Sequence, residues 1–477
     1  MELEAVIGLE VHVQLGTRSK LFCACSAEFG GTPNSRICPI CTGQPGVLPV
    51  LNREALRLAV LAGHALHCTI RTHTKFDRKN YFYPDLPKGY QISQFDQPIA
   101  YHGDLEFQMD DGTPRRAGIT RAHLEEDAGK AVHPEGATIS LVDLNRAGIP
   151  LIEIVGEPDL RSPAEAGAYL TALRRTLRYA RVSECDMEKG SMRCDANVSI
   201  RTSGSERLGT KVEVKNMNSI RNVEHALAFE IERQKNLLLA GECIIQETRS
   251  FRDADGTTVR MRVKEQADDY RYFPDPDLPL FELDPSWIES IRRLLPESYR
   301  ERRRRYEKDL ALSDYDAEVL TEDREVSDWF EKVLAEGVAP KVAANWVQGE
   351  ILAHLNATAA PIGTLRIGPR DLAELLSMVD AGELSQLAAK KVLKEMLSAG
   401  GRARDCAQSL DLLQMRDSSE LNAIVDQVLR EDPKTVADYQ GGKKSAINGL
   451  IGKVMRASRG KGDPQVIKQL LAERLGG

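Results

Sequence analysis

Residues 119–130 read Ile-Thr-Arg-Ala-His-Leu-Glu-Glu-Asp-Ala-Gly-Lys and concentrate ionisable side chains. Because alternate side chains of a β-strand share a face, a strand here puts Arg121, His123, Glu125 and Asp127 on one side. Burying a base, carboxylates and a guanidinium is costly unless something neutralises their charge. A divalent cation or an anionic substrate would do so. The alternative is a half-solvated antiparallel strand without chemistry.

Four other stretches predict strands with a similar polar face. They are residues 6–15 with Glu10, His12 and Gln14, residues 151–155 with Glu153, residues 192–201 with Arg193, Asp195, Asn197 and Ser199, and residues 211–215 with Lys211, Glu213 and Lys215. Carboxylate oxygens and imidazole nitrogens are suitable ligands for Mg²⁺ or Mn²⁺. Their recurrence favours a metal site on this sheet over a set of merely solvated faces.

The composition restricts the class of protein. A chain of 477 residues can form two to four domains with a large core. Its net charge of −7 means that any contact with nucleic acid must come from a local basic patch. No N-terminal apolar segment and no apolar run long enough to span a membrane is seen, so we expect a cytoplasmic protein with no membrane partner.

Two closely spaced cysteine pairs predict a zinc site. Cys23-Ala-Cys25 and Cys38-Pro-Ile-Cys41 are separated by twelve residues, and two such pairs joined by a loop are typical of tetrahedral zinc coordination. Four thiolates form a closed shell with no open position for water or substrate, so we interpret the zinc as structural. The alternative is four thiols that only cluster. The odd total of nine cysteines does not suggest a disulfide framework.

The strand and helix patterns that surround these residues predict an α+β fold over roughly the first 290 residues. A mixed, mainly antiparallel sheet is expected, with a further strand at 257–264. Helices are expected at 52–68 with Asn52 as N-cap, at 162–179 with a capping box of Ser162, Pro163 and Glu165, and at 219–239 before Gly241. Residues 76–94 and 268–277 are aromatic loops that line a site or, alternatively, only pack well.

From Trp287 the pattern is helical and contains two basic segments. Arg300 and residues 302–305 form an arginine run, which we interpret as a solvated helix face rather than an RNA contact. Residues 443–468 hold seven Lys or Arg against one acid, among several glycines. This pattern favours contact with a phosphate backbone, with a solvated tail as the alternative. No P-loop, dinucleotide fingerprint or nucleophile elbow is present.

Long motifs of the chain resemble the B subunits of the tRNA-dependent amidotransferases. They are Val6-Ile-Gly-Leu-Glu-Val-His-Val-Gln-Leu15 and residues 76–94, 123–130, 143–155, 193–199 and 269–274, and residues 452–464 resemble the family's tail domain, which also occurs in small stand-alone proteins. The resemblance covers nearly the whole chain. It implies a catalytic cradle over residues 1–292 with the zinc loop, a helical domain over 293–407 and a small helical tail over 408–477.

The resemblance also implies an activity, that of a glutamine-hydrolysing ligase. The side-chain carboxylate of misacylated Glu-tRNA(Gln) or Asp-tRNA(Asn) is phosphorylated with ATP, and ammonia then displaces phosphate to leave the amide. The substrate depends on which synthetases the cell has. An amidase, the A subunit, makes the ammonia from glutamine, and a small C subunit clamps it to the B subunit. The implied partners are therefore the A and C subunits, the misacylated tRNA and, in a larger assembly, a non-discriminating synthetase.

By residue-wise match, the resemblance implies roles for particular side chains. His12, Glu125 and Glu153 are the first choice for a Mg²⁺ or Mn²⁺ site, and Glu10 and Asp195 are the next candidates, for a second ion; these five are the expected catalytic residues. Lys79, Tyr81, Lys88, Arg271 and Asp275 are expected in the substrate loops and at the mouth of the ammonia tunnel. Lys443, Lys444, Lys453, Arg456, Arg459 and Lys461 are expected to contact tRNA. Some family members lack Cys23, Cys25, Cys38 and Cys41, so the expected Zn²⁺ is not needed for the chemistry.

Two rival interpretations explain parts of the chain. A zinc-stapled tRNA-binding scaffold without chemistry explains the cysteines and the basic tail, but acidic strands would repel RNA. A metal-dependent hydrolase explains the face of carboxylates and histidines. ATP dependence would separate an amidotransferase from a hydrolase.

Overall fold

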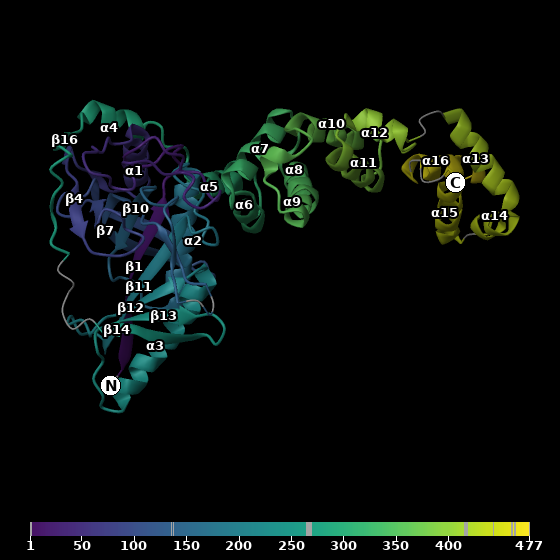
Figure 1. Cartoon of the computed structure of the whole chain (residues 1–477). Helices are drawn as coiled ribbons and strands as arrows, with labels where there is room; N and C mark the ends of the chain where they lie inside the picture. The colour runs from purple at the N-terminus through teal and green to yellow at the C-terminus, as the bar shows by residue number, and fades with distance from the viewer. Residues whose placement is uncertain are drawn as a thin grey trace. The chain divides into compact units, whose positions relative to one another are not determined.

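The structure is a computed structural model that describes residues 2–134, 136, 138–263, 270–414, 418–441, 443–458, 461 and 464–476. It divides into two compact units, Met1–Tyr299 and Arg300–Gly477 (Figure 1). The second unit has two separate hydrophobic clusters, one formed by residues between 306 and 407 and the other by residues between 421 and 475. The division into three domains at 292 and 407 stays a prediction. Within the described ranges, no helix is both long and apolar enough to cross a bilayer.

The first unit is built on one large sheet. Its strands are β1 (Leu3–Gln14), β2 (Thr69–Ile70), β4 (Asp77–Asn80), β5 (Tyr90–Ser93), β6 (Ala100–Gln108), β7 (Pro114–Glu126), β10 (Pro150–Gly156), β11 (Met192–Thr202), β12 (Val212–Met217), β13 (Glu247–Arg252), β14 (Thr257–Val263) and β15 (Phe273–Pro274). In the described part of the chain, their order is β14-β13-β12-β11-β1-β10-β7-β5-β4-β15, and β6 joins β7 to β2. Two small ribbons pair β3 (His73–Thr74) with β16 (Phe281–Glu282) and β8 (Lys130–Val132) with β9 (Leu141–Asp143).

Helices complete the first unit and make up the second. The first unit contains α1 (Arg53–Ala65), α2 (Pro163–Tyr179), α3 (Ile220–Leu239) and α4 (Pro285–Arg292). The chain continues through α5 (Tyr299–Asp309), α6 (Asp314–Leu320), α7 (Arg324–Ala335), α8 (Pro340–Trp346), the π-helix η1 (Val347–Ile351), α9 (Leu352–Thr358), η2 (Ile362–Thr364), α10 (Pro369–Asp380), α11 (Gln386–Ala399), α12 (Ala403–Ser409), α13 (Ser418–Glu431), α14 (Pro433–Gln440), η3 (Lys444–Ala446), α15 (Ile447–Ala457) and α16 (Pro464–Leu475). The predicted fold, a mixed sheet followed by helical segments, is confirmed.

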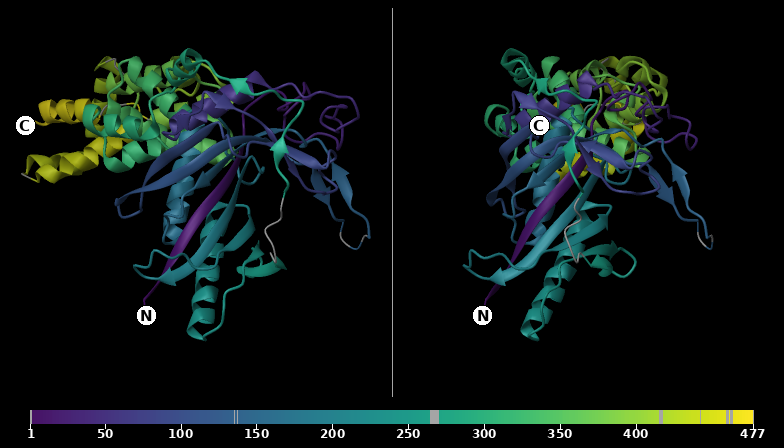
Figure 2. Two further views of the ribbon diagram at one scale, coloured as in Figure 1. Left: turned by 90° about the vertical axis from the view of Figure 1, so that its left-hand side faces the viewer. Right: turned by 60° about the vertical axis from the view of Figure 1, so that its left-hand side comes forward.

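Strand β1 lies inside the sheet between β10 and β11 (Figure 2). Its apolar side chains Ile7, Leu9, Val11 and Val13 are fully buried in the main core. Side chains from α1, α2 and α3 belong to the same core cluster, so these helices bury one face of the sheet. The alternation predicted for β1 therefore leaves its polar side chains on the other face. Among the described residues, the paired strands run antiparallel except β12 with β13.

The helix ends follow the predicted capping residues. The Asn52 Oδ1 atom accepts a hydrogen bond from the Glu54 amide at 2.9 Å and starts α1, which ends three residues earlier than predicted. The Ser162 hydroxyl accepts from the Glu165 amide at 3.1 Å. In return, the Glu165 carboxylate accepts from the Arg161 amide at 2.6 Å, so the reciprocal bond of the predicted capping box goes to Arg161 rather than Ser162.

The interpretation of the arginine run as a solvated face is wrong for Arg302, Arg303 and Arg305. Arg302 is only 7% exposed, and its Nη1 atom lies 2.6 Å from Asp328 of α7. Arg303 pairs with Asp314 of α6 at 2.5 Å, and Arg305 with Glu331 of α7 at 2.5 Å. These arginines therefore attach α5 to α6 and α7 through ion pairs with acids of those two helices.

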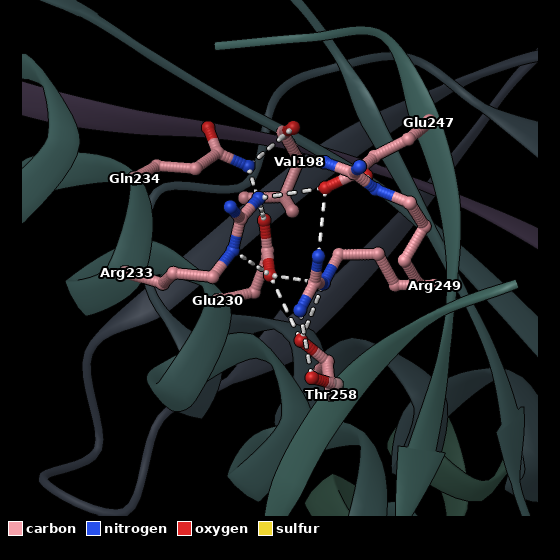
Figure 3. A network of polar contacts seen from close by, with 8 residues as sticks. Val198, Glu230, Arg233, Gln234, Glu247, Arg249 and Thr258 are labelled. Atoms are coloured by element: carbon pink, nitrogen blue, oxygen red, sulfur yellow. Dashed lines mark hydrogen bonds and ion pairs between the residues drawn. The ribbon is translucent and has the colours of Figure 1, made fainter. Parts of the chain in front are cut away.

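A buried network of charges fastens the hairpin β13–β14 to α3 (Figure 3). Glu230 of α3 is fully buried and accepts hydrogen bonds from Arg233 Nε at 2.9 Å, Gln234 Nε2 at 2.9 Å and Thr258 Oγ1 at 3.1 Å. The Arg249 guanidinium donates to the Thr258 carbonyl at 2.7 Å and lies 3.4 Å from Glu230. Since β13 pairs with β12, this network also supports the strand that carries Lys215 into the polar face.

Changing Glu230→Gln should destabilise the protein, because it keeps the shape of the side chain but leaves two partly buried guanidinium groups, those of Arg233 and Arg249, with one carboxylate fewer. Breaking a buried ion pair in this way typically costs about 3–5 kcal/mol. Urea unfolding of the purified chain measures the loss. The control is Glu232→Gln on the same helix, where the side chain is exposed. Equal unfolding midpoints for the two variants would contradict the role of the network.

Candidate active site

The register of four central strands aligns polar side chains in one row. His123 of β7 is opposite Glu153 of β10, Glu153 is opposite His12 of β1, and His12 is opposite Arg193 of β11. Because directly opposed residues of antiparallel strands point to the same face, these four side chains are neighbours across the sheet. Segments far apart in the chain thus contribute to a single row.

The adjacent rows on this face contain the other predicted acids. One row runs through Arg121, Val155, Glu10 and Asp195, and the other through Glu125, Leu151 and Gln14. The rows show that the polar faces predicted for separate strands are one continuous surface.

Three of the predicted residues form a compact cluster. His12 Nε2 lies 3.3 Å from Glu125 Oε1 and 3.3 Å from Glu153 Oε2, and one donor atom from each residue lies within 4.8 Å of the others. Both carboxylates are buried. Burial alone would lower the pKa of His12, but its hydrogen bonds to the two carboxylates raise that pKa to about 10. Once a bound cation has displaced the His12 proton, one imidazole and two carboxylates at this spacing fit the donor set of a hard divalent cation.

His123 is a further member of this site. Its side chain is buried, its Nε2 atom lies 3.4 Å from Glu153 Oε2, and its Nδ1 atom has no hydrogen-bond partner among the described residues. Although burial opposes ionisation of Glu153, His123 and His12 together keep its pKa well below the usual value. The sequence prediction placed His123 on this face but gave it no role. Its position two residues before Glu125 on the same strand could have identified it as a member of the site.

A cavity of about 320 Å³ opens at the cluster. Of the predicted site residues, His12, Glu125, Asp195, Lys79 and Tyr81 line it. Arg193 and Lys215 also line it, although the sequence prediction gave them no role. Arg193 alternates with Asp195 on β11, and Lys215 alternates with Glu213 on β12. The strand pattern that predicted the acids could therefore also have predicted these two cations.

Glu10 and Asp195 lie outside the three-residue cluster. Within the residues that the structure describes, the grouping of possible metal ligands on the sheet contains only His12, Glu125 and Glu153. Glu10 accepts a hydrogen bond from Asn197 Nδ2 at 2.8 Å, and Asp195 lies 2.5 Å from Lys215 Nζ. These two acids therefore face an amide and an ammonium group, and a second ion at this position stays a prediction.

The loop residues predicted to act together are divided between different places. Lys79 and Tyr81 line the cavity at the cluster, whereas Lys88 forms an ion pair with Glu126 and lines a separate cavity of about 210 Å³. The separate cavity also contains Cys23 and Cys41 in its wall.

The second aromatic loop is described from residue 270 onward. Asp275 is buried and accepts a hydrogen bond from Arg78 Nε at 2.9 Å, so it anchors this loop to β4 and lines neither cavity. Arg271 has a positive φ of 43°, and its carbonyl accepts from Asn80 Nδ2 at 2.8 Å. Both contacts hold the loop beside β4, the strand that carries Lys79.

The four predicted zinc ligands come together. One sulfur each from Cys23, Cys25, Cys38 and Cys41 lies within 4.8 Å of the others, and all four are free thiols. The buried Lys20 ammonium lies 3.6 Å from Cys41 Sγ. A hydrogen bond from Cys23 and the charge of Lys20 help lower the pKa of Cys41 to about 4. Cys41 therefore favours the thiolate, the form that binds metal, whereas the hydrogen bond to Cys41 raises the pKa of Cys23 and burial raises the pKa of Cys25 to about 11.

The basic tail is less positive than its sequence suggests. Lys453 lies 2.6 Å from Asp432, and Lys461 lies 2.5 Å from Asp411. Both acids precede the basic segment, so counting charges within residues 443–468 overstated the local charge. Lys443, Lys444 and Arg456 are exposed, whereas the predicted contact Arg459 lies outside the described residues.

Comparison with known proteins agrees with the resemblance in the motifs. Residues 5–289 match the family described as GatB/GatE catalytic domain, and residues 328–475 match the GatB domain. Three similar proteins are each named as the B subunit of aspartyl/glutamyl-tRNA(Asn/Gln) amidotransferase. That of Moorella thermoacetica is 51% identical over 100% of both chains, that of Carboxydothermus hydrogenoformans is 49% identical over 99% of both chains, and that of Gloeobacter violaceus is 49% identical over 100% of this chain and 87% of the relative. The chain therefore belongs to the family of B subunits of the aspartyl/glutamyl-tRNA amidotransferases.

Proposed function

We propose that this chain activates the side-chain carboxylate of Glu-tRNA(Gln), Asp-tRNA(Asn) or both with ATP, so that ammonia can convert it to the amide. The observation that carries the proposal is the cluster of His12, Glu125 and Glu153 beside a cavity of about 320 Å³. Family membership supports the same activity, because the relatives are named for amidotransfer on these tRNAs. It also favours this function over the hydrolase and the scaffold.

The chemistry explains why activation must come first. A carboxylate is a poor acyl donor to ammonia, because the leaving group would be oxide. When a carboxylate oxygen attacks the γ-phosphorus of ATP, ADP leaves and an acyl phosphate forms. Ammonia then attacks the acyl carbon, the C–O bond to phosphate breaks, and the nitrogen loses a proton to give the amide. Phosphate is the leaving group, so one difficult substitution becomes two easier steps.

The residues of the cluster have defined tasks in this proposal. His12, Glu125 and Glu153 would hold Mg²⁺ or Mn²⁺, which neutralises charge around the transferring phosphoryl group. His123 keeps Glu153 oriented through its contact at 3.4 Å. Arg193 and Lys215 keep the neighbouring acids of the cavity neutralised, since they pair with Asp127 at 2.9 Å and Asp195 at 2.5 Å.

The proposed reaction needs further protein chains. The relatives' name denotes one subunit of a larger enzyme, which supports a complex with an amidase, the A subunit, that releases ammonia from glutamine, together with a small C subunit. The tRNA is the substrate carrier, and association with a non-discriminating synthetase is a further expectation. The cytoplasmic location stays a prediction.

We further propose that the four-cysteine cluster holds one structural Zn²⁺. Four sulfurs within 4.8 Å of one another suit a closed tetrahedral shell. The nearby ion pair of Lys88 with Glu126 connects this region to β7, so the zinc would stiffen the loop beside the strand that carries Glu125.

Glu125→Gln keeps the shape of the side chain but removes one negative charge from the proposed cation site. Mg²⁺ prefers charged oxygen ligands, so ATP-dependent activation of Glu-tRNA should fall by at least ~10²-fold, the typical loss for one electrostatic contributor. Hydroxylamine, added as an external trap, measures the activated species without using the ammonia tunnel. Glu206→Gln, an exposed change on the same unit, is the control. If the variant is trapped at the wild-type rate but loses glutamine-dependent amidation, Glu125 is not needed for activation and instead serves the ammonia tunnel.

Zinc content should fall together with stability in Cys23→Ser, because zinc binding free energy contributes to folding free energy. Metal analysis of the purified chain and its thermal unfolding midpoint measure the two quantities. The exposed Cys243→Ser is the matched control and should change neither. Stoichiometric zinc in a variant carrying both Cys23→Ser and Cys38→Ser would show that the cysteines do not hold it.

The exposed tail cations should contact the tRNA backbone. Changing Lys443, Lys444 and Arg456 together to Ala should weaken tRNA binding and flatten its salt dependence. With about 0.7–0.9 counterions released per phosphate contact, the log–log slope should fall by about 2–3. Titrations at several salt concentrations measure this slope. Lys394→Ala, an exposed cation outside the tail, is the control. An unchanged salt dependence in the triple variant would show that these tail residues do not contact the tRNA backbone.

A further inference from the structure

Lys79 brings a positive charge to the wall of the active-site cavity. It lies on the short strand β4, opposite Gln91 of β5, and both residues line the cavity together with His12 and Glu125. The position follows from strand pairing, so the side chain is presented by a regular element rather than by a free loop end.

The other cations that line the cavity are already paired with acids. Arg193 Nη2 lies 2.9 Å from Asp127, and Lys215 Nζ lies 2.5 Å from Asp195 and 3.2 Å from Glu213. Their charges are therefore neutralised within the protein and offer little to an anionic ligand.

Lys79 differs from both, because it forms no ion pair with any residue in the part of the chain that the structure describes. Its close neighbour is the ring of Tyr270, whose centroid lies 4.9 Å from Nζ. Burial opposes its charge, but the carboxylates of Glu125 and Glu153 raise its pKa above the usual value, so the side chain stays an ammonium group. An ammonium group carries three donors, and the half-buried Lys79 can offer them to a ligand in the cavity.

Lys79 offers one positive charge beside a wall of aromatic side chains. Tyr81, Tyr270 and Tyr272 form an aromatic wall beside it, with ring centroids 6.0 and 6.2 Å apart along the series. Before a divalent cation binds, a substrate carboxylate that approaches Glu125 and Glu153 is repelled by their two buried negative charges, which the imidazolium of His12 offsets only in part. A cation on the cavity wall offsets this repulsion, and one ammonium suits a carboxylate better than a triphosphate chain.

We propose that Lys79 binds the side-chain carboxylate of the misacylated residue and keeps contact with an oxygen of the acyl phosphate after activation. This inference rests on the proposed function and assigns the residue that recognises the negative charge of the substrate side chain. It differs from the expectation that Lys79 serves the passage of ammonia, because a carboxylate ligand is needed before any ammonia is used.

The test compares two tRNAs that differ only in the charge of the aminoacyl group. The complex of this chain with the A and C subunits is titrated, without ATP, with Glu-tRNA(Gln) and with Gln-tRNA(Gln), or with the Asp and Asn pair on tRNA(Asn). The wild type should prefer the charged side chain by about tenfold or more, since hydrogen bonds to charged groups are the stronger kind. Lys79→Met should abolish this preference, and Lys79→Arg should retain part of it.

Activation provides the second measurement. Hydroxylamine trapping of activated Glu-tRNA should fall by about 10²-fold in Lys79→Met, the typical loss for one electrostatic contributor. Lys189→Met, an exposed change on the same unit, should leave the preference and the trapping rate unchanged. Thermal unfolding midpoints of all variants establish that they are folded, and Lys79→Gln replaces Lys79→Met if the methionine variant unfolds early.

The outcomes separate this inference from the proposed function. If Lys79→Met keeps both the preference and the trapping rate but loses glutamine-dependent amidation, Lys79 serves the ammonia path and the inference is overturned. A wild type that shows no preference also overturns it. If the wild-type complex binds Glu-tRNA preferentially but forms no activated species with ATP, the proposed function fails while the carboxylate contact stands.

Discussion

The register of β1 between β10 and β11 is the constraint on which the site depends. It sets His12 directly opposite both Glu153 and Arg193, and β10 in turn sets Glu153 opposite His123. A slip of one residue would turn every side chain of β1 to the other face. The fully buried Ile7, Leu9, Val11 and Val13 resist such a slip, because it would expose them and bury Glu10 and His12. Burial of apolar side chains on one face of the sheet therefore keeps Glu10 and His12 on the polar face.

Some charged groups on the polar face are paired within the protein and others are not, and the unpaired groups are the ones that a ligand can bind. Asp127 and Asp195 each have a cationic partner, Arg193 and Lys215, within 3 Å. Glu125 and Glu153 contact imidazoles, and the Lys79 ammonium on the cavity wall forms no ion pair with either glutamate. Since a buried charge costs several kcal/mol unless it is compensated, a cation brought by a ligand would stabilise the two buried glutamates. An anion would likewise stabilise the half-buried Lys79.

Strand β7 connects the two clusters that contain possible metal ligands. Neighbouring side chains of a strand point to opposite faces, and Glu125 and Glu126 accordingly line two different cavities. Glu125 belongs to the carboxylate and histidine cluster, whereas Glu126 pairs with Lys88 in the cavity whose wall includes Cys23 and Cys41. Strand β7 therefore contributes a carboxylate to each cavity, Glu125 to one and Glu126 to the other.

The sequence by itself determined the features that depend on near neighbours in the chain. Alternation revealed the polar faces of the strands, Asn52 and Ser162 marked helix starts, and the spacing of the cysteines brought their thiols together. The long motifs determined the family. These signals are local, because side-chain periodicity, capping and short loops involve residues close in sequence.

Only the tertiary structure decided which distant residues meet. It separated Glu10 and Asp195 from the cluster of His12, Glu125 and Glu153, and it buried Asp275 against Arg78 away from both cavities. It likewise supplied acids from other helices to Arg302 and Lys453. Strand register and helix packing determine such contacts through burial summed over whole elements, and no short stretch of sequence contains that information.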